Sequence, residues 1–333
     1  MKHYNIPVFV AHMGCPHDCV FCSQKTITGT QDIMTPYKAK KIIDKFLKEI
    51  NPQGYVEIAF FGGSFTGIPK EERTAFLEVA SKYVRKGTVS GIRLSTRPDY
   101  ITEEILTELK NHGVTAIELG VQSLDSEVLM LSGRGHDAEC VKTAVELIRK
   151  FPFELGLQMM TGLPGDSFEK SLQTAHEFVK LKPDTVRIYP TLVIKGTALE
   201  KLYQSGKYTP MSVEDAAELL GELKEIFDSA GIKIIRMGLQ TTEEISRDGE
   251  VVAGPFHEAI GELAKSNIFL KKLYKLLENY NGSEAVVGCN KGEVSQVIGH
   301  KRCNAQAIYN KYKIKLVVIP DSETDKGKLK ILR

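Results

Sequence analysis

The sequence predicts an α/β fold, in which a parallel sheet flanked by helices is followed by a small C-terminal α/β module. Short apolar runs rich in β-branched or aromatic residues alternate with amphipathic stretches of helical length up to about residue 250. Polar or glycine-rich motifs directly follow several of these runs, as in folds whose chemistry gathers at the carboxyl ends of parallel strands. The alternation is compatible with a barrel or with a doubly wound layer.

The expected strands and helices follow one another along the chain. Strands are predicted at residues 7–12, 56–61, 91–95, 116–121, 155–160, 185–189 and 232–236. Helical patterns cover residues 36–50, 70–85, 102–111, 138–150, 168–181 and 213–230. The first helix has a clear start, because Thr35 suits the N-cap and Pro36 suits the first helical position.

The rhythm changes near residue 250, where we expect the core to end. A helical extension over residues 251–280 precedes the break at Asn281-Gly282, and residues 281–333 form a separate small domain. Within this domain the pattern predicts a strand at 284–288, helices at 293–298 and 304–312 around a loop at 299–302, and a strand at 315–319.

Composition is that of an ordinary globular protein, with 42% hydrophobic and 26% charged residues in 333. No apolar run approaches the roughly 20 residues of a membrane span, and the N-terminus lacks the order of a secretory signal, so we expect a cytoplasmic protein. Residues 281–333 hold ten Lys or Arg against five Asp or Glu, whereas residues 1–280 hold 34 against 37. This split indicates an anionic partner for the basic part.

Three cysteines follow the first predicted strand, at Cys15, Cys19 and Cys22. In a reducing compartment such a cluster indicates a thiolate metal site, either an iron–sulfur cluster or zinc. The zinc alternative would use His12 or His17 as a fourth ligand. The remaining cysteines, Cys140, Cys289 and Cys303, are scattered and are interpreted as buried small hydrophobes.

Motifs at later strand ends point to the same site. They are Gly62-Gly63-Ser64, Thr96-Arg97-Pro98-Asp99, Gln122-Ser123 and Gly162-Leu163-Pro164-Gly165. Because the carboxyl ends of parallel strands meet at one edge, we expect these motifs to surround the cysteines.

The spacing C-x3-C-x2-C, with Phe21 before the last cysteine, resembles the radical S-adenosylmethionine superfamily. Residues 60–65 resemble its glycine motif, and residues 118–123 and 133–136 resemble segments of oxygen-independent coproporphyrinogen oxidase and of the Elongator catalytic subunit. Residues 96–100, 187–197 and 205–208 resemble the Elongator subunit more specifically. The resemblance covers roughly residues 7–262, and nothing after it resembles an acetyltransferase domain.

This resemblance implies a partial (β/α)6 TIM-like barrel and a [4Fe-4S] cluster on Cys15, Cys19 and Cys22. It implies that Gly62, Gly63 and Ser64 bind the methionine end of S-adenosylmethionine, that Gln122 contacts its ribose and that Arg134 pairs with its carboxylate. Phe21 would lie beside the cofactor, and an external one-electron reductant would be needed. Without the cysteines, Arg134 would be interpreted as part of a surface salt bridge and Gln122 as a side chain that satisfies backbone groups.

The basic domain resembles a K-homology module, whose G-x-x-G loop clamps single-stranded nucleic acid. The corresponding loop here is Gly299-His300-Lys301-Arg302, in which arginine replaces the second glycine. The alternative is a small basic domain that merely packs against the core.

Three functions remain open from the sequence. The first is a radical enzyme that cleaves S-adenosylmethionine to a 5′-deoxyadenosyl radical and modifies RNA, in particular transfer RNA. The second is a radical enzyme acting on a small or tetrapyrrole-like substrate, and the third is a zinc-stabilised RNA-binding protein without catalysis. The sequence leaves open the atom attacked, the fate of the cofactor, the reductant and the oligomeric state.

Overall fold

The computed structural model describes residues 2–11, 13–15, 18–23, 33–50, 54–239 and 249–333. These residues divide into two compact units, the first formed by residues 1–210 and 226–256 and the second by residues 211–225 and 257–333. No helix among them is long and apolar enough to span a lipid bilayer. The domain boundaries expected near residues 250 and 280 stay a prediction.

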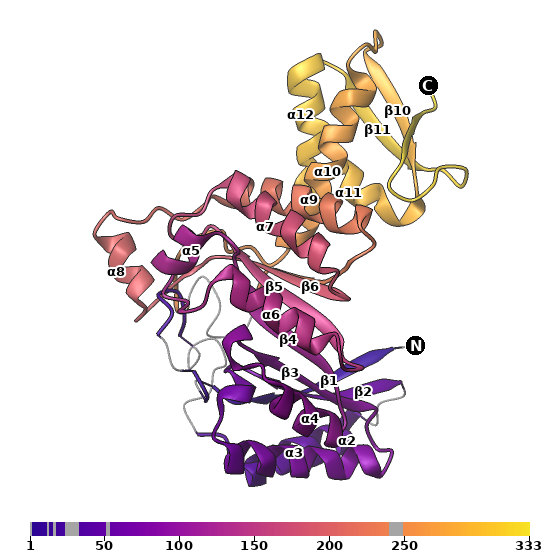
Figure 1. The fold of residues 1–333 in the computed structure, drawn as a ribbon. Coiled ribbons are helices and arrows are strands. Elements are labelled where there is room, and N and C mark those ends of the chain that lie inside the picture. Colours follow the sequence, from indigo (N-terminus) through magenta and orange to yellow (C-terminus); the bar gives the residue numbers. More distant parts are fainter. Residues whose placement is uncertain (1, 12, 16–17, 24–32, 51–53, 240–248) are drawn as a thin grey trace. The chain divides into compact units, whose positions relative to one another are not determined.

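The first unit is built on a sheet of parallel strands (Figure 1). The order of its strands is β1, β2, β3, β4, β5, β6 and β8. Strands that follow one another along the chain are therefore neighbours in this sheet. The sequential order excludes a doubly wound layer, whose order reverses at a switch point. The expected partial barrel is therefore confirmed. The strands are β1 (His3–Phe9), β2 (Tyr55–Phe61), β3 (Gly91–Thr96), β4 (Val114–Gln122), β5 (Glu154–Thr161), β6 (Thr185–Pro190) and β8 (Lys233–Met237).

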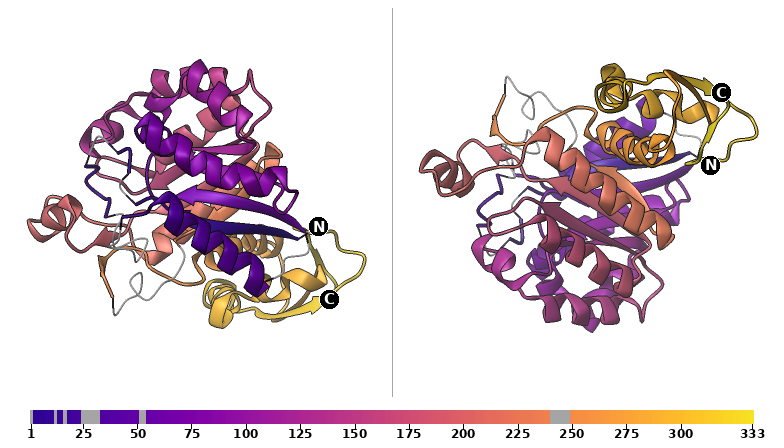
Figure 2. Two further views of the ribbon diagram at one scale, coloured as in Figure 1. Left: turned by 90° about the horizontal axis from the view of Figure 1, so that it is seen from below. Right: turned by 90° about the horizontal axis from the view of Figure 1, so that it is seen from above.

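Helices alternate with these strands along the chain (Figures 1 and 2). They are α2 (Pro36–Ile50), α3 (Lys70–Arg85), α4 (Glu103–Asn111), α5 (Ser126–Leu131), α6 (Ala138–Ile148), α7 (Phe168–Leu181), α8 (Ala198–Gln204) and α9 (Val213–Ser229). Helix α2 begins as expected, because Thr35 Oγ1 accepts a hydrogen bond from the Lys38 backbone at 3.2 Å. Helices α4 to α8 each begin at a Ser, Thr or Asp N-cap whose side chain accepts a backbone N–H. A short antiparallel pair joins β7 (Val193–Ile194) to β9 (Val251–Ala253).

The two faces of the sheet differ in chemistry. On one face Phe60 of β2 packs against Phe76 of α3, with ring centroids 5.9 Å apart. Because side chains alternate along a strand, Glu57 points to the opposite face. There Arg93 donates to Glu57 at 3.0 Å and to Glu118 at 3.3 Å, and Glu118 also pairs with Arg187. Sequence patterns did not indicate this buried ionic row across β2, β3, β4 and β6.

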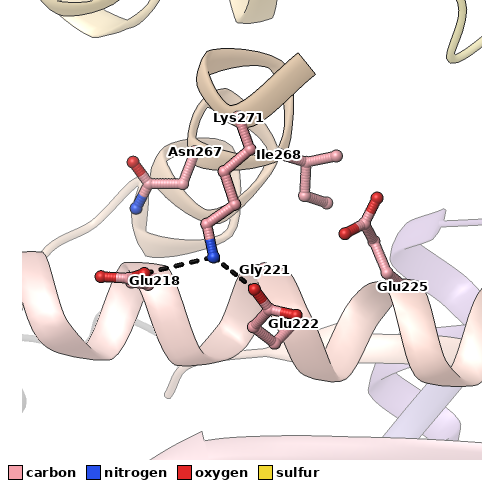
Figure 3. Close-up of a pocket in the computed structure, with 7 residues that line it drawn as sticks. All are labelled: Glu218, Gly221, Glu222, Glu225, Asn267, Ile268 and Lys271. Atoms are coloured by element: carbon pink, nitrogen blue, oxygen red, sulfur yellow. Dashed lines mark hydrogen bonds and ion pairs between the residues drawn. The ribbon is translucent and has the colours of Figure 1, made fainter. Parts of the chain in front are cut away.

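The second unit contains α10 (Ile260–Leu277), β10 (Glu284–Cys289), α11 (Val294–Ile298), α12 (Cys303–Tyr312), β11 (Lys315–Pro320) and β12 (Leu329–Ile331). Its small sheet has the order β11, β10, β12, with β10 parallel to β11 and antiparallel to β12. The expected small α/β module is confirmed. Lys271 of α10 forms ion pairs with Glu218 and Glu222 of α9 in a shallow pocket (Figure 3). We interpret these pairs as structural, since each charge is already matched.

Candidate active site

The cysteine loop begins where the chain leaves β1 and lies directly on the loop after β2. Val10 N–H donates to the Phe61 carbonyl at 2.7 Å, and Ser64 N–H donates to the Met13 carbonyl at 3.0 Å. The backbones of Gly14 and Gly67 approach so closely that a Cβ atom on either would overlap the other loop. The first cysteine therefore follows a segment held against the predicted glycine motif.

The three cysteines differ in exposure. Cys19 is buried, whereas Cys15 and Cys22 are half-buried, and none of the three forms a disulfide. Cys22 N–H donates to the Cys19 carbonyl at 3.0 Å, which closes a tight turn between these two. In the described part of the chain, no three His, Cys, Asp or Glu side chains converge as metal ligands. His12 and His17, the ligands of the zinc alternative, lie outside the described residues.

Arg134 connects the cysteine loop to the end of β4. Its Nη1 donates to Cys19 Sγ at 3.1 Å and its Nη2 donates to the Gly120 carbonyl. The residue is only 6% exposed, so the alternative of a surface salt bridge is wrong. Its Nε is buried without a hydrogen-bond partner among the described residues. The guanidinium thus keeps a donor available within the site.

Arg97 joins the glycine motif to Arg134. Its side chain grips Asp99 through two hydrogen bonds of 2.9 Å and donates to the Arg134 carbonyl. Its backbone N–H donates to Ser64 Oγ at 3.3 Å, and Ser64 Oγ lies 3.0 Å from Thr96 Oγ1. In the sequence both residues belonged to the motif at residues 96–99, without an individual role for either. Their position at the carboxyl end of β3 was the available signal.

Gln122 sits at a distortion of β4. Its backbone has φ 73°, and the pairing with β5 shifts register between Gly120 and Gln122. Such bulges re-aim side chains beside active sites. Gln158 Nε2 donates to Gln122 Oε1 at 3.2 Å, so the partner of this amide is a side chain on the neighbouring strand. A Cβ on Gly120 would lie 3.3 Å from Gln122 Nε2 and 3.7 Å from Arg134 Nη2, which brings both predicted cofactor residues to one place.

Burial and the positive charge of the arginines act in opposite directions on the pKa of Cys15 and in the same direction on the pKa of His136. Burial raises the pKa of the Cys15 thiol, while a backbone hydrogen bond from Ser64 and the charges of Arg97 and Arg134 lower it, and the balance is a raised pKa. Burial, with the Arg134 charge, lowers the pKa of His136 to about 4. His136 is therefore neutral at pH 7, and it lies close enough to Arg134 and Arg97 for their charges to lower its pKa.

Phe21 belongs to an apolar cluster beside the cysteines. The cluster contains Cys19, Phe21, Val128, Leu163, Val193, Leu199 and Tyr208. The Tyr208 hydroxyl donates to the Gly162 carbonyl at 2.5 Å, which ties this cluster to the glycine-rich loop after β5. An apolar wall of this kind excludes water from reactive chemistry.

The predicted RNA-binding residues lie in the second unit, in the loop between α11 and α12. Gly299 is buried, whereas His300, Lys301 and Arg302 are exposed. Lys301 and Arg302 both have left-handed backbones, with φ 51° and 65°. Cys303 follows them and is exposed, so its interpretation as a buried small hydrophobe is wrong, whereas for Cys289 it is confirmed.

Family comparisons agree with the cysteine motif. The family described as the radical SAM superfamily matches residues 10–178, and the radical SAM C-terminal domain matches residues 183–270. The tRNA uridine(34) acetyltransferase of Methanocaldococcus jannaschii is 27% identical over 89% of this chain and 59% of its own length. The human Elongator complex protein 3 is 32% identical over 50% of this chain and 34% of its own length.

A solved structure shows the same fold. An N-terminally truncated archaeal Elp3 from Methanocaldococcus infernus has a TM-score of 0.62 and 25% identity, over 83% of this chain and 62% of that chain. The chain spans 49 to 59% of the length of the tRNA uridine(34) acetyltransferases that it matches. The matched family model covers half of the sequence and includes the cysteine loop. The chain therefore belongs to the radical S-adenosylmethionine superfamily, with a radical domain similar to that of the Elongator catalytic subunit.

Proposed function

We propose that this chain holds a [4Fe-4S] cluster on Cys15, Cys19 and Cys22, cleaves S-adenosylmethionine reductively and modifies transfer RNA. Membership of the superfamily makes the chain a radical S-adenosylmethionine enzyme and implies this cofactor together with an iron–sulfur cluster. When bound, the pair supplies a 5′-deoxyadenosyl radical after one-electron reduction by an external donor.

The main support for this proposal is that Arg134 donates hydrogen bonds both to Cys19 and to the Gly120 carbonyl near the end of β4. Three cysteines on one loop, none of them in a disulfide, are a suitable donor set for an iron–sulfur cluster, and their side chains would turn toward one another as it assembles. The positive charges of Arg97 and Arg134 favour the thiolate form that metal binding requires. Arg134 also has a geometry suited to gripping a carboxylate. Gly62, Gly63, Ser64 and Gln122 would complete the cofactor site.

The choice of transfer RNA rests on the relatives and on charge. The relatives include proteins named as tRNA uridine(34) acetyltransferases, although the chain spans only 49 to 59% of their length. The excess of Lys and Arg in residues 281–333 suits a polyanionic substrate.

Anaerobic reconstitution with iron and sulfide tests the radical chemistry. We expect a brown protein that, once reduced, converts S-adenosylmethionine to 5′-deoxyadenosine and methionine, measured by liquid chromatography. Cys19→Ala should lose both bound iron and cleavage, whereas Cys140→Ala, outside the loop, should keep them. A colourless protein with one bound zinc would contradict the proposal.

Cofactor binding gives a readout that does not depend on turnover. Arg134→Gln should weaken S-adenosylmethionine binding to the reconstituted protein about tenfold to a hundredfold, since hydrogen bonds to charged groups contribute about 1.5–3 kcal/mol. The exposed Arg149→Gln serves as control. Equal affinity of the two variants in calorimetry would argue against the assigned role of Arg134.

The substrate is tested by nucleoside analysis. Transfer RNA from cells with and without this protein is digested and compared by mass spectrometry. A modified nucleoside that disappears with the protein supports the proposal, and identical nucleoside profiles would exclude transfer RNA as the substrate.

A further inference from the structure

One face of α12 carries an exposed row of cations, an amide and an aromatic ring. Arg302, Gln306, Tyr309 and Lys313 are spaced at i, i+4, i+7 and i+11, so they share one side of the helix and its two flanking residues. All four are exposed, and Tyr309 is 50% exposed, which is unusual for a large aromatic side chain. We call these four residues the α12 stripe, and it is about 16 Å long at 1.5 Å per helical residue.

The cations of the α12 stripe are not matched by carboxylates. Within the described residues Arg302 forms no ion pair, nor does the neighbouring Lys301, while Lys313 donates only to the Asn310 carbonyl at 3.3 Å and lies 5.7 Å from the Tyr309 ring centroid. Lysines along the small sheet differ, since Lys315, Lys328 and Lys330 pair with Glu284, Asp325 and Glu323 at 2.7 to 3.4 Å. Arg302 and Lys313, at the two ends of α12, therefore offer positive charge that no carboxylate among the described residues neutralises.

The loop that leads into the stripe is held in one conformation. Gly299 has φ 84°, and a Cβ there would lie 2.5 Å from Cys303 Sγ and 2.7 Å from Asn304 N, so only glycine fits. Asn304 is buried, and its Nδ2 donates to the Ser266 carbonyl at 2.8 Å and the Val297 carbonyl at 3.1 Å. These bonds tie the start of α12 to α10 and to the end of α11. A ligand that binds here therefore meets a loop that needs little further ordering.

We infer that the α12 stripe and the loop at residues 299–302 form a docking track for single-stranded RNA. Exposed cations spaced along a track neutralise backbone phosphates, and an exposed ring between them offers a stacking surface for an unpaired base. The amide of Gln306 can hydrogen-bond a base edge. Duplex RNA keeps its bases stacked inward and cannot offer a free base to Tyr309. This inference rests on the proposed function and names where its RNA substrate binds.

Binding of a fluorescein-labelled oligouridylate to the reconstituted full chain, followed by fluorescence anisotropy over a series of salt concentrations, tests the inference. The double variant R302Q/K313Q is compared with K328Q/K330Q, which loses the same charge from exposed lysines that are carboxylate-paired. We expect R302Q/K313Q to bind about tenfold or more weakly, with a log–log salt slope lower by about 1.4, at about 0.7 for each lost phosphate contact.

Two variants of Tyr309 test whether its ring stacks on a base. Tyr309→Ala should weaken binding about tenfold, whereas Tyr309→Phe, which keeps the ring, should retain affinity. The thiol of Cys303 next to the loop gives a local readout, because bound RNA should slow its alkylation by a maleimide in peptide mapping while leaving Cys140 unaffected. Circular dichroism checks that each variant is folded.

Two results would overturn the inference. One is the same affinity and salt slope for R302Q/K313Q and K328Q/K330Q, and the other is equal affinity for the oligonucleotide and for its annealed duplex. If the proposed function is wrong but this inference is right, the wild-type protein would bind the oligonucleotide without cleaving S-adenosylmethionine.

Discussion

Replacing Gly67 by alanine should displace the cysteine loop without touching any residue assigned to the cofactor. A Cβ at Gly67 would lie about 1 Å inside ordinary van der Waals contact with the Gly14 carbonyl oxygen, which is backbone and has no rotamer to relieve the overlap. Either the overlap remains, at a cost of about 1–3 kcal/mol in the free energy of unfolding, or the loop moves away by about 1 Å. Cys15 follows Gly14 directly, so its sulfur would move as well.

The expected consequence is a loss of activity larger than the loss of stability. A shift of about 1 Å in a reacting geometry costs on the order of a hundredfold in rate. Gly67→Ala should therefore show lower iron content after reconstitution and S-adenosylmethionine cleavage slowed by about two orders of magnitude. Urea unfolding followed by circular dichroism should show a decrease of no more than about 3 kcal/mol.

Gly292→Ala is the matched control. The nearest atom to a Cβ at Gly292 is Asn290 Oδ1 at 3.6 Å, which is ordinary contact. The claim that this close approach fixes the two loops against each other would be refuted if Gly67→Ala and Gly292→Ala had the same iron content, unfolding midpoint and cleavage rate.

Two further predictions concern buried charge. Arg93→Met should lower the free energy of unfolding by about 3–5 kcal/mol in urea titration, because it leaves the buried Glu57 carboxylate without the Arg93 guanidinium. The control Arg149→Met breaks a half-exposed ion pair and should lower the free energy of unfolding by no more than about 1 kcal/mol. Equal decreases in the two variants would contradict the importance of the buried ionic row. The pKa of His136 is about 4 in the folded protein and about 6.5 in the unfolded chain, so between these pH values the unfolded chain binds one more proton and the free energy of unfolding falls as the pH is lowered. His136→Gln should therefore reduce the decrease in the free energy of unfolding between pH 7 and pH 5 by about 2 kcal/mol relative to the wild type. An unchanged pH dependence would show that His136 is not held neutral.

Local signals were sufficient for most of the fold. The helices at Pro36–Ile50, Lys70–Arg85 and Phe168–Leu181 have the predicted bounds, because capping residues and apolar periodicity act within a few residues of one another. The short helices α5 and α8 were missed, since each is too short to show a period. The sequential strand order, which distinguishes a partial barrel from a doubly wound layer, appeared only in the structure.

For the candidate site too, some features could be predicted from the sequence and others were shown only by the structure. The three thiols, the glycine motif and Gln122 could be singled out from the sequence because they stand at the carboxyl ends of predicted strands, which meet at one edge of a parallel sheet, whereas Arg134 was singled out only by the family resemblance. Only the tertiary structure showed that Arg134 donates to Cys19, 115 residues away in the chain, that β4 bulges at Gln122, and that Arg97 links the glycine motif to Arg134. The exposed α12 stripe likewise emerged only once the partners of each lysine were known. Hydrogen bonds and ion pairs depend on distances between residues far apart in sequence, and local propensity carries no information about those distances.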